Sequence, residues 1–173
     1  TYLFGGDDTF SEYGWNFKTD QKILEARAWF PYGQGIPEVT KVLEFPRTFF
    51  GEAVSLSMRA DYLCRNIITE LKTSSRSFHQ KGKTRNYLDS MQALSYMYAW
   101  GIPIVFIFCQ ISIKEMPSGI NVITVKDMDR AIAYPNKSSD DRLMECVDSL
   151  IPYLKSDEKI YERVTTREPK EIL

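Results

Sequence analysis

The chain has 173 residues, of which 43% are hydrophobic and 26% are charged, and its formal net charge is −1. This length and apolar content predict one globular domain, residues 1–173, with a hydrophobic core. No apolar run approaches the roughly 20 residues of a membrane-spanning helix, so we expect no membrane association. The near-neutral charge argues against nucleic-acid binding through an overall positive field.

The three cysteines, Cys64, Cys109 and Cys146, are odd in number and widely spaced, which fits neither a disulfide framework nor a zinc site. We expect buried thiols of a reducing compartment, so the predicted location is intracellular, either cytoplasmic or nuclear. The chain begins at Thr1 without an initiator methionine. We therefore expect a processed chain or a fragment of a larger protein.

The N-terminal segment shows little regular patterning. Residues 1–18 mix aromatic residues with glycine and aspartate without a clean period, which predicts an irregular lead-in. Thr19 or Asp20 can cap a helix through KILEARAWF, which should stop before Pro31. Residues 31–38 are rich in turn-forming residues, so the strands should begin after them.

Three consecutive strands are expected in TKVLEF, AVSLSMRADYL and NIITELKT, with a tight turn at Arg65-Asn66 between the last two. A helix should follow from about Arg85 to Trp100, closed by Gly101 and the proline two residues later. The continuous apolar run IPIVFIFCQISI is typical of a central strand covered on both faces. GINVITV predicts a further strand.

A last helix is expected in DRLMECVDSLIPYL, capped by Ser138 or Ser139. Its apolar stripe comprises Leu143, Cys146, Val147, Leu150 and Leu154. Residues 155–173 are highly charged and should form a C-terminal tail beyond the core. The order helix, three-strand meander, helix, two strands, helix predicts an α/β (α+β) fold with a central mixed β-sheet flanked by helices.

Two acidic residues and a lysine stand out in the second and third predicted strands. Asp61 closes one apolar run, and the next run carries Glu70 and Lys72 in the order Glu-Leu-Lys. Because side chains alternate along a strand, Glu70 and Lys72 should share one side while Leu71 points into the core. Two carboxylates and an ammonium suit a hard divalent cation and a negatively charged substrate, as in phosphodiester hydrolysis. A solvated, charge-paired strand face has the same pattern.

The segment from Lys72 to Leu88 contains basic residues and no acid. Its basic residues after Lys72 are Arg76, His79, Lys81, Lys83 and Arg85. Directly after the strand of Glu70, such a segment could hold phosphate groups. A solvated polar loop is the alternative.

A helical projection of residues 87–100 separates two faces. Gln92 and Tyr96, four residues apart, are neighbours on one flank. The stripe that should pack on the sheet consists of Tyr87, Met91, Leu94 and Tyr98. An amide beside a phenol can donate hydrogen bonds to a phosphate or a base edge. A partly buried polar pair is the alternative.

These motifs in this order resemble the PD-(D/E)XK nuclease superfamily. The matching motifs are RADYL, IITELKTS and QALSY, followed by Gly-Ile-Pro and an apolar strand. The Gln-x-x-x-Tyr spacing is similar to that of the RecB/lambda-exonuclease-like branch. The resemblance covers about residues 20–113. It implies a restriction-endonuclease-like core and a Mg²⁺- or Mn²⁺-dependent DNA nuclease, either an endonuclease or an exonuclease.

The resemblance also implies a role for each matching residue. Asp61, Glu70 and Lys72 would be catalytic, with Lys72 positioning or helping to deprotonate the attacking water. The metal would be bound by Asp61, Glu70 and the Leu71 backbone carbonyl, and Glu25 matches the position of a further acidic ligand. Gln92 and Tyr96 would bind the nucleic acid, DNA rather than RNA. The charge pattern adds Arg76, Lys81, Lys83 and Arg85 as candidates to hold its phosphates. A helicase or polymerase could be a partner.

The chain departs from the family pattern in three places. Its three cysteines cannot hold the four-cysteine iron–sulfur cluster that is common in this branch. His79 follows the Glu-Leu-Lys motif, so we expect a loop residue there and no metal ligand. Ala60 stands where the family has proline, which leaves the metal chemistry intact.

Two alternatives stay open. Glu-Leu-Lys-Thr-Ser followed by a helix ending in Gly-Ile-Pro also resembles decapping and pyrophosphohydrolase enzymes of the same superfamily, which act on RNA. The chain could also be a non-catalytic module that keeps the fold for nucleic-acid binding or assembly.

Overall fold

The computed structural model describes residues 9–12, 15–18, 35–49, 52–78, 83–115, 117, 121–156 and 159. The elements in this part of the chain are β1 (Thr9–Glu12), β2 (Trp15–Lys18), β3 (Ile36–Phe49), β4 (Glu52–Cys64), β5 (Ile67–Ser74), α2 (Lys83–Leu88), α3 (Met91–Trp100), β6 (Ile104–Glu115), β7 (Asn121–Ala133) and α4 (Lys137–Ser156). None of the described helices combines the length and apolar character needed to cross a membrane.

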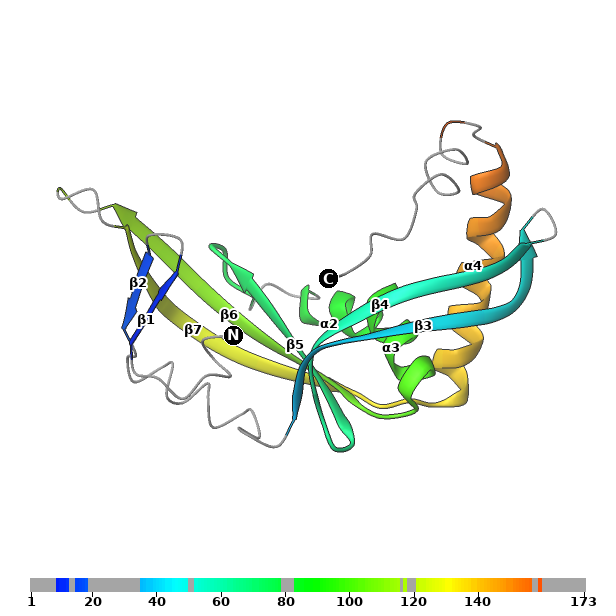
Figure 1. The fold of residues 1–173 in the computed structure, drawn as a ribbon, viewed down its shortest axis with the longest axis horizontal. Coiled ribbons are helices and arrows are strands. Elements are labelled where there is room, and N and C mark those ends of the chain that lie inside the picture. The colour runs from blue at the N-terminus through cyan, green and yellow to red at the C-terminus, as the bar shows by residue number, and fades with distance from the viewer. Residues whose placement is uncertain are drawn as a thin grey trace.

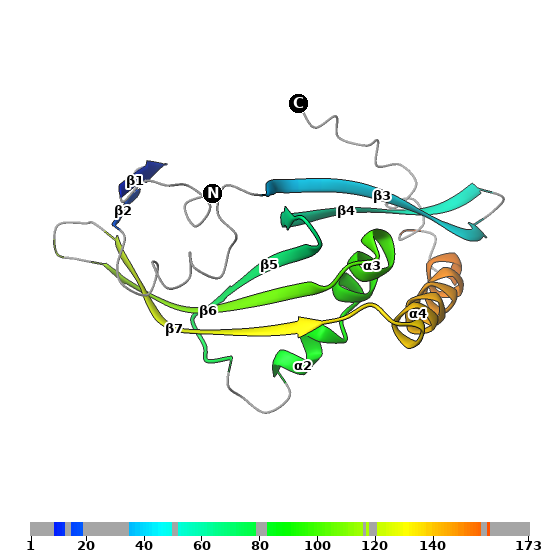
Figure 2. The same ribbon diagram turned by 90° about the horizontal axis from the view of Figure 1, so that it is seen from below.

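The fold is α+β, built on a five-stranded mixed sheet in the order β3-β4-β5-β6-β7 (Figures 1 and 2). Neighbouring strands are antiparallel except β5 and β6, which are parallel. Helices α2 and α3 form the connection that a parallel pair requires. The predicted order of meander, helix, two strands and helix is confirmed for the described residues. β1 and β2 form a separate antiparallel pair.

The main core lies between one face of the sheet and the three helices. Ile104, Phe106 and Phe108 alternate along β6 and are fully buried with Leu94 of α3 and Leu143 of α4. The intervening Ile107 faces the other side of the sheet, where it packs with Tyr62 and Cys64. The prediction of a strand covered on both faces is therefore confirmed for the first half of β6.

The helix predicted over 85–100 is interrupted. Asp89 and Ser90 separate α2 from α3, because the Ser90 hydroxyl accepts a hydrogen bond from the Ala93 N–H (3.3 Å) and caps a new helix. The predicted stop is confirmed: Gly101 has φ 66°, in the left-handed region, and its N–H donates to the Met97 carbonyl at 2.8 Å.

The last helix begins earlier than predicted. The cap is Asn136, whose side-chain oxygen accepts from the Ser139 N–H, while the Ser139 hydroxyl accepts from the Asn136 N–H, both at 3.0 Å. In the predicted apolar stripe only Leu143 and Val147 are buried. Cys146 is exposed, so the prediction of three buried thiols is wrong for this one, while Cys64 and Cys109 are buried.

Two further expectations differ from the structure. Residues 9–12 and 15–18 form strands inside the predicted irregular lead-in, because aromatic residues favour a pleated strand even in four-residue segments. β7 continues to Ala133, well beyond GINVITV, because its antiparallel ladder with β6 extends as far as the pair Ile104↔Ala133. The helix predicted through KILEARAWF lies outside the described residues.

The aromatic core beneath α2 should dominate the stability of the sheet. The Phe108 ring lies 5.0 Å from that of Phe78 and 5.2 Å from that of Tyr87, measured between centroids. We expect Phe108→Ala to lower the free energy of unfolding by about 3–5 kcal/mol, measured by urea denaturation. Ile113→Ala on the same strand removes a side chain that is 61% exposed and should cost less than about 1 kcal/mol. Equal losses would contradict this assignment of the core.

Candidate functional site

The site is built where β4 and β5 separate. Their ladder contains only the pairs Tyr62↔Thr69, Leu63↔Ile68 and Cys64↔Ile67. Beyond it, side chains replace the ladder: Asp61 Oδ2 accepts a hydrogen bond from the Leu71 N–H (2.8 Å), and Glu70 Oε1 accepts one from the Asp61 N–H (3.2 Å). From the site, the first part of β4 lies on the side of α4, while β5 runs away from α4 beside β6 (Figure 1).

The backbone of β3 is also irregular at this level. Ladder pairs flank the position where Glu38 would face Asp61 in an unchanged register, but that pair is absent from the ladder. Glu38 has φ 54°, which is uncommon for a residue with a side chain. On β4, Ala60 packs in the main core and Tyr62 packs on the opposite face. The alternation of side chains is therefore broken at Asp61, so its carboxylate can turn toward β5 instead of following its neighbours.

Glu70 is the centre of the site and is only 2% exposed. Its Oε2 accepts hydrogen bonds from Lys72 Nζ at 3.2 Å and from Gln92 Nε2 at 3.0 Å. Glu70 and Lys72 share one side of β5 as predicted, and Leu71 packs on the opposite face. That shared side is the face covered by α3, which explains why Glu70 is buried and is not part of a solvated strand face.

Helix α3 contributes a hydrogen-bonded chain to the site. Gln92 Oε1 accepts from Lys72 Nζ at 2.7 Å, and Gln92 Nε2 also contacts Tyr96 Oη at 3.3 Å. The Tyr96 hydroxyl donates to the Arg59 carbonyl. Tyr96 is 4% exposed and packs edge-to-face on Trp100. The predicted pair is thus brought to the acidic centre, but Tyr96 lies in the core, because α3 is covered on this flank as well.

The environment shifts the acidity of two of these groups. Burial raises the pKa of Glu70, and the nearby negative charge of Asp61 raises it further, while Lys72 and the Asp61 N–H partly oppose this. Burial also raises the pKa of Tyr96 to about 12. The Tyr96 hydroxyl therefore keeps its proton at neutral pH and remains a donor to the Arg59 carbonyl.

The donor set suits a hard divalent cation. Mg²⁺ is commonly held by one or two carboxylates and retains several waters. Asp61 and Glu70 provide two carboxylates, and with the Lys72 ammonium the three groups carry one formal negative charge, which a cation would offset. Within the described ranges no three His, Cys, Asp or Glu side chains converge on one point. Glu25, the further ligand predicted from the resemblance, lies outside the described residues.

The predicted phosphate-binding segment is described only in part. Arg76 is exposed just after β5. Arg85 is exposed and pairs with Asp89 at 3.6 Å, and Asp89 also binds Arg142 of α4 at 2.8 Å. Only the backbone of Lys83 is described, at the start of α2, and Lys81 and His79 lie outside the described residues. Arg85 thus joins α2 to the loop before α3 and is not among the groups that contact Glu70.

Two contacts at the site had no signal in the sequence. The Arg59 carbonyl, two residues before Asp61, receives the Tyr96 hydroxyl. The Phe106 ring lies below Lys72, whose Nζ is 5.8 Å from the ring centroid. Phe106 reaches this place because the parallel register pairs it with Glu70. This pairing could be read only after β5 and β6 were known to be neighbours.

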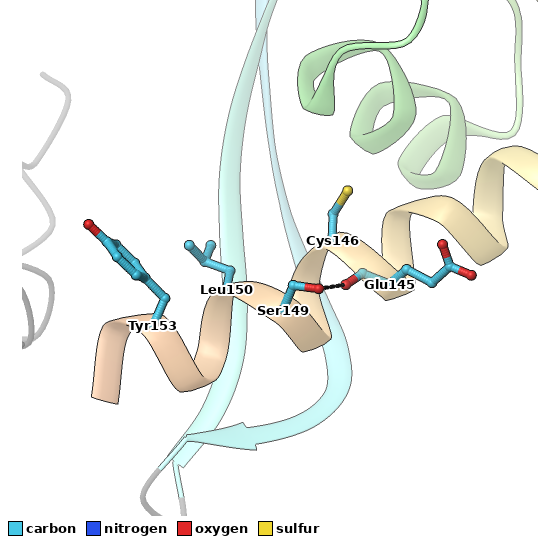
Figure 3. A pocket seen from close by; sticks show the side chains of 5 residues that line it. All are labelled: Glu145, Cys146, Ser149, Leu150 and Tyr153. Atoms are coloured by element: carbon cyan, nitrogen blue, oxygen red, sulfur yellow. Dashed lines mark hydrogen bonds between the residues drawn. The ribbon is translucent and has the colours of Figure 1, made fainter. Parts of the chain in front are cut away.

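A separate pocket of about 480 Å³ lies on α4, away from these groups. Figure 3 shows its lining side chains along one side of the helix, with the Ser149 hydroxyl donating to the Glu145 carbonyl at 2.7 Å. None of the residues predicted to be functional lines it. Its described lining residues are Glu145, Cys146, Ser149, Leu150 and Tyr153. The chemistry of the chain is therefore expected at Glu70 and not in this pocket.

No family model matches the sequence, and no curated protein matches it. The chain is similar to one solved structure, the crystal structure of SSO0001, with a TM-score of 0.46 and 17% sequence identity. The similar region covers 68% of this chain and 50% of SSO0001. The chain therefore spans about half the length of that protein.

The raised pKa of Glu70 predicts a pH-dependent stability. A carboxyl group whose pKa is higher in the folded state stabilises the fold when protonated, and this contribution is lost as the pH rises through the raised value. In EDTA, we expect the unfolding free energy of Glu70→Gln relative to wild type to increase as the pH rises from about 4 to 8. Urea denaturation across that range measures this difference. A difference that is constant or falls with pH would contradict it.

Proposed function

We propose that the chain is a metal-dependent nuclease that hydrolyses phosphodiester bonds in DNA and belongs to the PD-(D/E)XK superfamily. The observation that carries the proposal is that Asp61 and Lys72 both contact the buried carboxylate of Glu70, at the point where β4 and β5 separate. A buried carboxyl group whose pKa is raised by its surroundings, as that of Glu70 is, is typical of a reactive site. The order of motifs in the sequence supports the same family.

Each residue has a role that follows from its contacts. Asp61 and Glu70 would hold Mg²⁺ or Mn²⁺, which supplies an activated water and neutralises charge on the phosphate. Lys72 carries an ammonium 3.2 Å from Oε2 of Glu70 and would stabilise negative charge that develops on the attacked phosphate. Gln92 fixes the Lys72 ammonium through its amide oxygen. Tyr96 fixes Gln92 and ties α3 to the strand of Asp61.

A non-catalytic nucleic-acid-binding module is the second candidate, and one observation favours it. Both oxygens of Glu70 already accept hydrogen bonds from protein groups, so the site is satisfied without a metal. The two functions differ in one measurable consequence. A binding module would retain nucleic acid in the presence of EDTA and would not cleave it when Mn²⁺ is added.

The nuclease proposal is tested with end-labelled single-stranded DNA, duplex DNA, RNA and capped RNA, each incubated with Mn²⁺ or EDTA. We expect Mn²⁺-dependent cleavage of DNA, and loss of at least about 10²-fold in rate for Asp61→Asn, Glu70→Gln and Lys72→Met. Lys137→Met on α4, which removes an exposed ammonium paired with Asp141, is the charge-matched control and should retain activity. Full cleavage by Glu70→Gln would refute the proposal, and cleavage confined to RNA would move the substrate to the decapping-like class.

A further inference from the structure

The Lys72 ammonium has two acceptors of different kinds. It lies 3.2 Å from Oε2 of Glu70, an anionic oxygen, and 2.7 Å from Oε1 of Gln92, a neutral one. The lysine side chain is 22% exposed, while that of Glu70 is 2% exposed. The lysine side chain is therefore largely shielded from solvent, and its ammonium acts directly on the carboxylate.

Glu70 has no oxygen without a protein donor. Oε1 accepts from the Asp61 N–H, and Oε2 accepts from both Lys72 and Gln92. Lys72 and Gln92 together use both lone pairs of Oε2, while Oε1 has one donor, the Asp61 N–H. A divalent cation on this carboxylate and the Lys72 ammonium would repel each other strongly in a poorly solvated site. Lys72 and a divalent cation must therefore compete for this carboxylate.

Gln92 provides Lys72 with an acceptor that does not belong to the carboxylates. Its amide oxygen makes the shorter of the two contacts with the Lys72 ammonium. Because this oxygen is neutral, a divalent cation does not need it as an anionic ligand. Tyr96 and Glu70 engage the amide nitrogen, which fixes the direction in which the oxygen points. If Lys72 loses Glu70, the Gln92 oxygen still keeps the ammonium within the site.

We propose that Lys72 is the internal counter-ion of the Asp61–Glu70 pair, that it leaves Glu70 when a divalent cation binds, and that Gln92 is the positioning residue that retains it. This inference rests on the proposed metal-dependent function and adds how the site is regulated. It has a consequence that a simple catalytic lysine does not share. Lys72 weakens the binding of the metal that its own reaction needs.

The test is calorimetric titration of Mn²⁺ into wild type, Lys72→Met and the charge-matched control Lys137→Met, with no nucleic acid present. We expect Lys72→Met to bind Mn²⁺ roughly tenfold more tightly than wild type, since removing one partly buried ammonium relieves the competition. Lys137→Met should bind as wild type does. Circular dichroism at the same temperature verifies that Lys72→Met is folded, and Lys72→Gln serves as a second variant if it is not.

The outcomes separate this inference from the proposed function. If wild type binds Mn²⁺ and Lys72→Met binds with equal or lower affinity, the competition is refuted while the nuclease proposal stands. If neither protein binds at millimolar Mn²⁺, both fail. If only Lys72→Met binds, the competition is supported and the wild-type enzyme needs substrate to complete its metal site.

The role of Gln92 has its own readout. At saturating Mn²⁺, Gln92→Ala should lower kcat roughly tenfold with little change in KM, because the substrate is still bound but Lys72 is no longer held. In the Lys72→Met background the same substitution should have no further effect on the residual kcat. Losses that multiply in the double variant would overturn the assignment of Gln92 as the residue that positions Lys72.

Discussion

The buried carboxylate of Glu70 connects three elements of the described part of the chain. It accepts hydrogen bonds from the backbone of β4, from a lysine on its own strand β5 and from an amide on helix α3. Burying a carboxylate is expensive unless hydrogen bonds and opposite charge offset the lost hydration. The raised pKa of Glu70 shows that this offset is incomplete. A further positive charge beside the Glu70 carboxylate would therefore stabilise its ionised form.

The separation of β4 from β5 is what makes room for this group. Had the ladder continued in the same register, Asp61 would have paired with Glu70 and Ala60 with Leu71 through their backbones. Instead the Asp61 carboxylate takes the Leu71 N–H, and the unusual backbone of Glu38 accompanies the change on the other side. Where the pairing of β4 and β5 ends, the two carboxylates thus accept hydrogen bonds from backbone N–H groups across the strands. Helix α3 then closes the site, since Gln92 and Tyr96 bridge β5 and β4.

The sequence was sufficient to predict the parts of the fold and of the site that depend on local residue patterns. The turn at Arg65, the stop at Gly101 and the apolar β6 follow from local chemistry, and the Glu-Leu-Lys order placed Glu70 and Lys72 on one side of a strand. The sequence was insufficient to predict the surroundings of a side chain that depend on tertiary packing. Tyr96 was placed outside the stripe that packs on the sheet, because a helical projection does not show that its hydroxyl reaches the backbone of β4.

The same limit explains the other differences. Ser90 lies inside the helix predicted from about Arg85 to Trp100, and the structure shows that it caps a new helix there. Cys146 belongs to an apolar stripe, yet α4 buries only the Leu143 and Val147 side of it. The Arg59 carbonyl, a backbone group, has no sequence signature at all. Residue types therefore identified the acidic centre, while the groups that orient it required the tertiary structure.

The central claim is that Asp61 and Glu70 together form a divalent cation site. Anomalous X-ray scattering from a crystal soaked in Mn²⁺ tests it most directly. The account predicts one strong peak within roughly 2.0–2.5 Å of a carboxylate oxygen of each residue, with the Lys72 ammonium beside Gln92. A saturating soak that leaves this position empty, or that places Mn²⁺ only at other carboxylates, would contradict it.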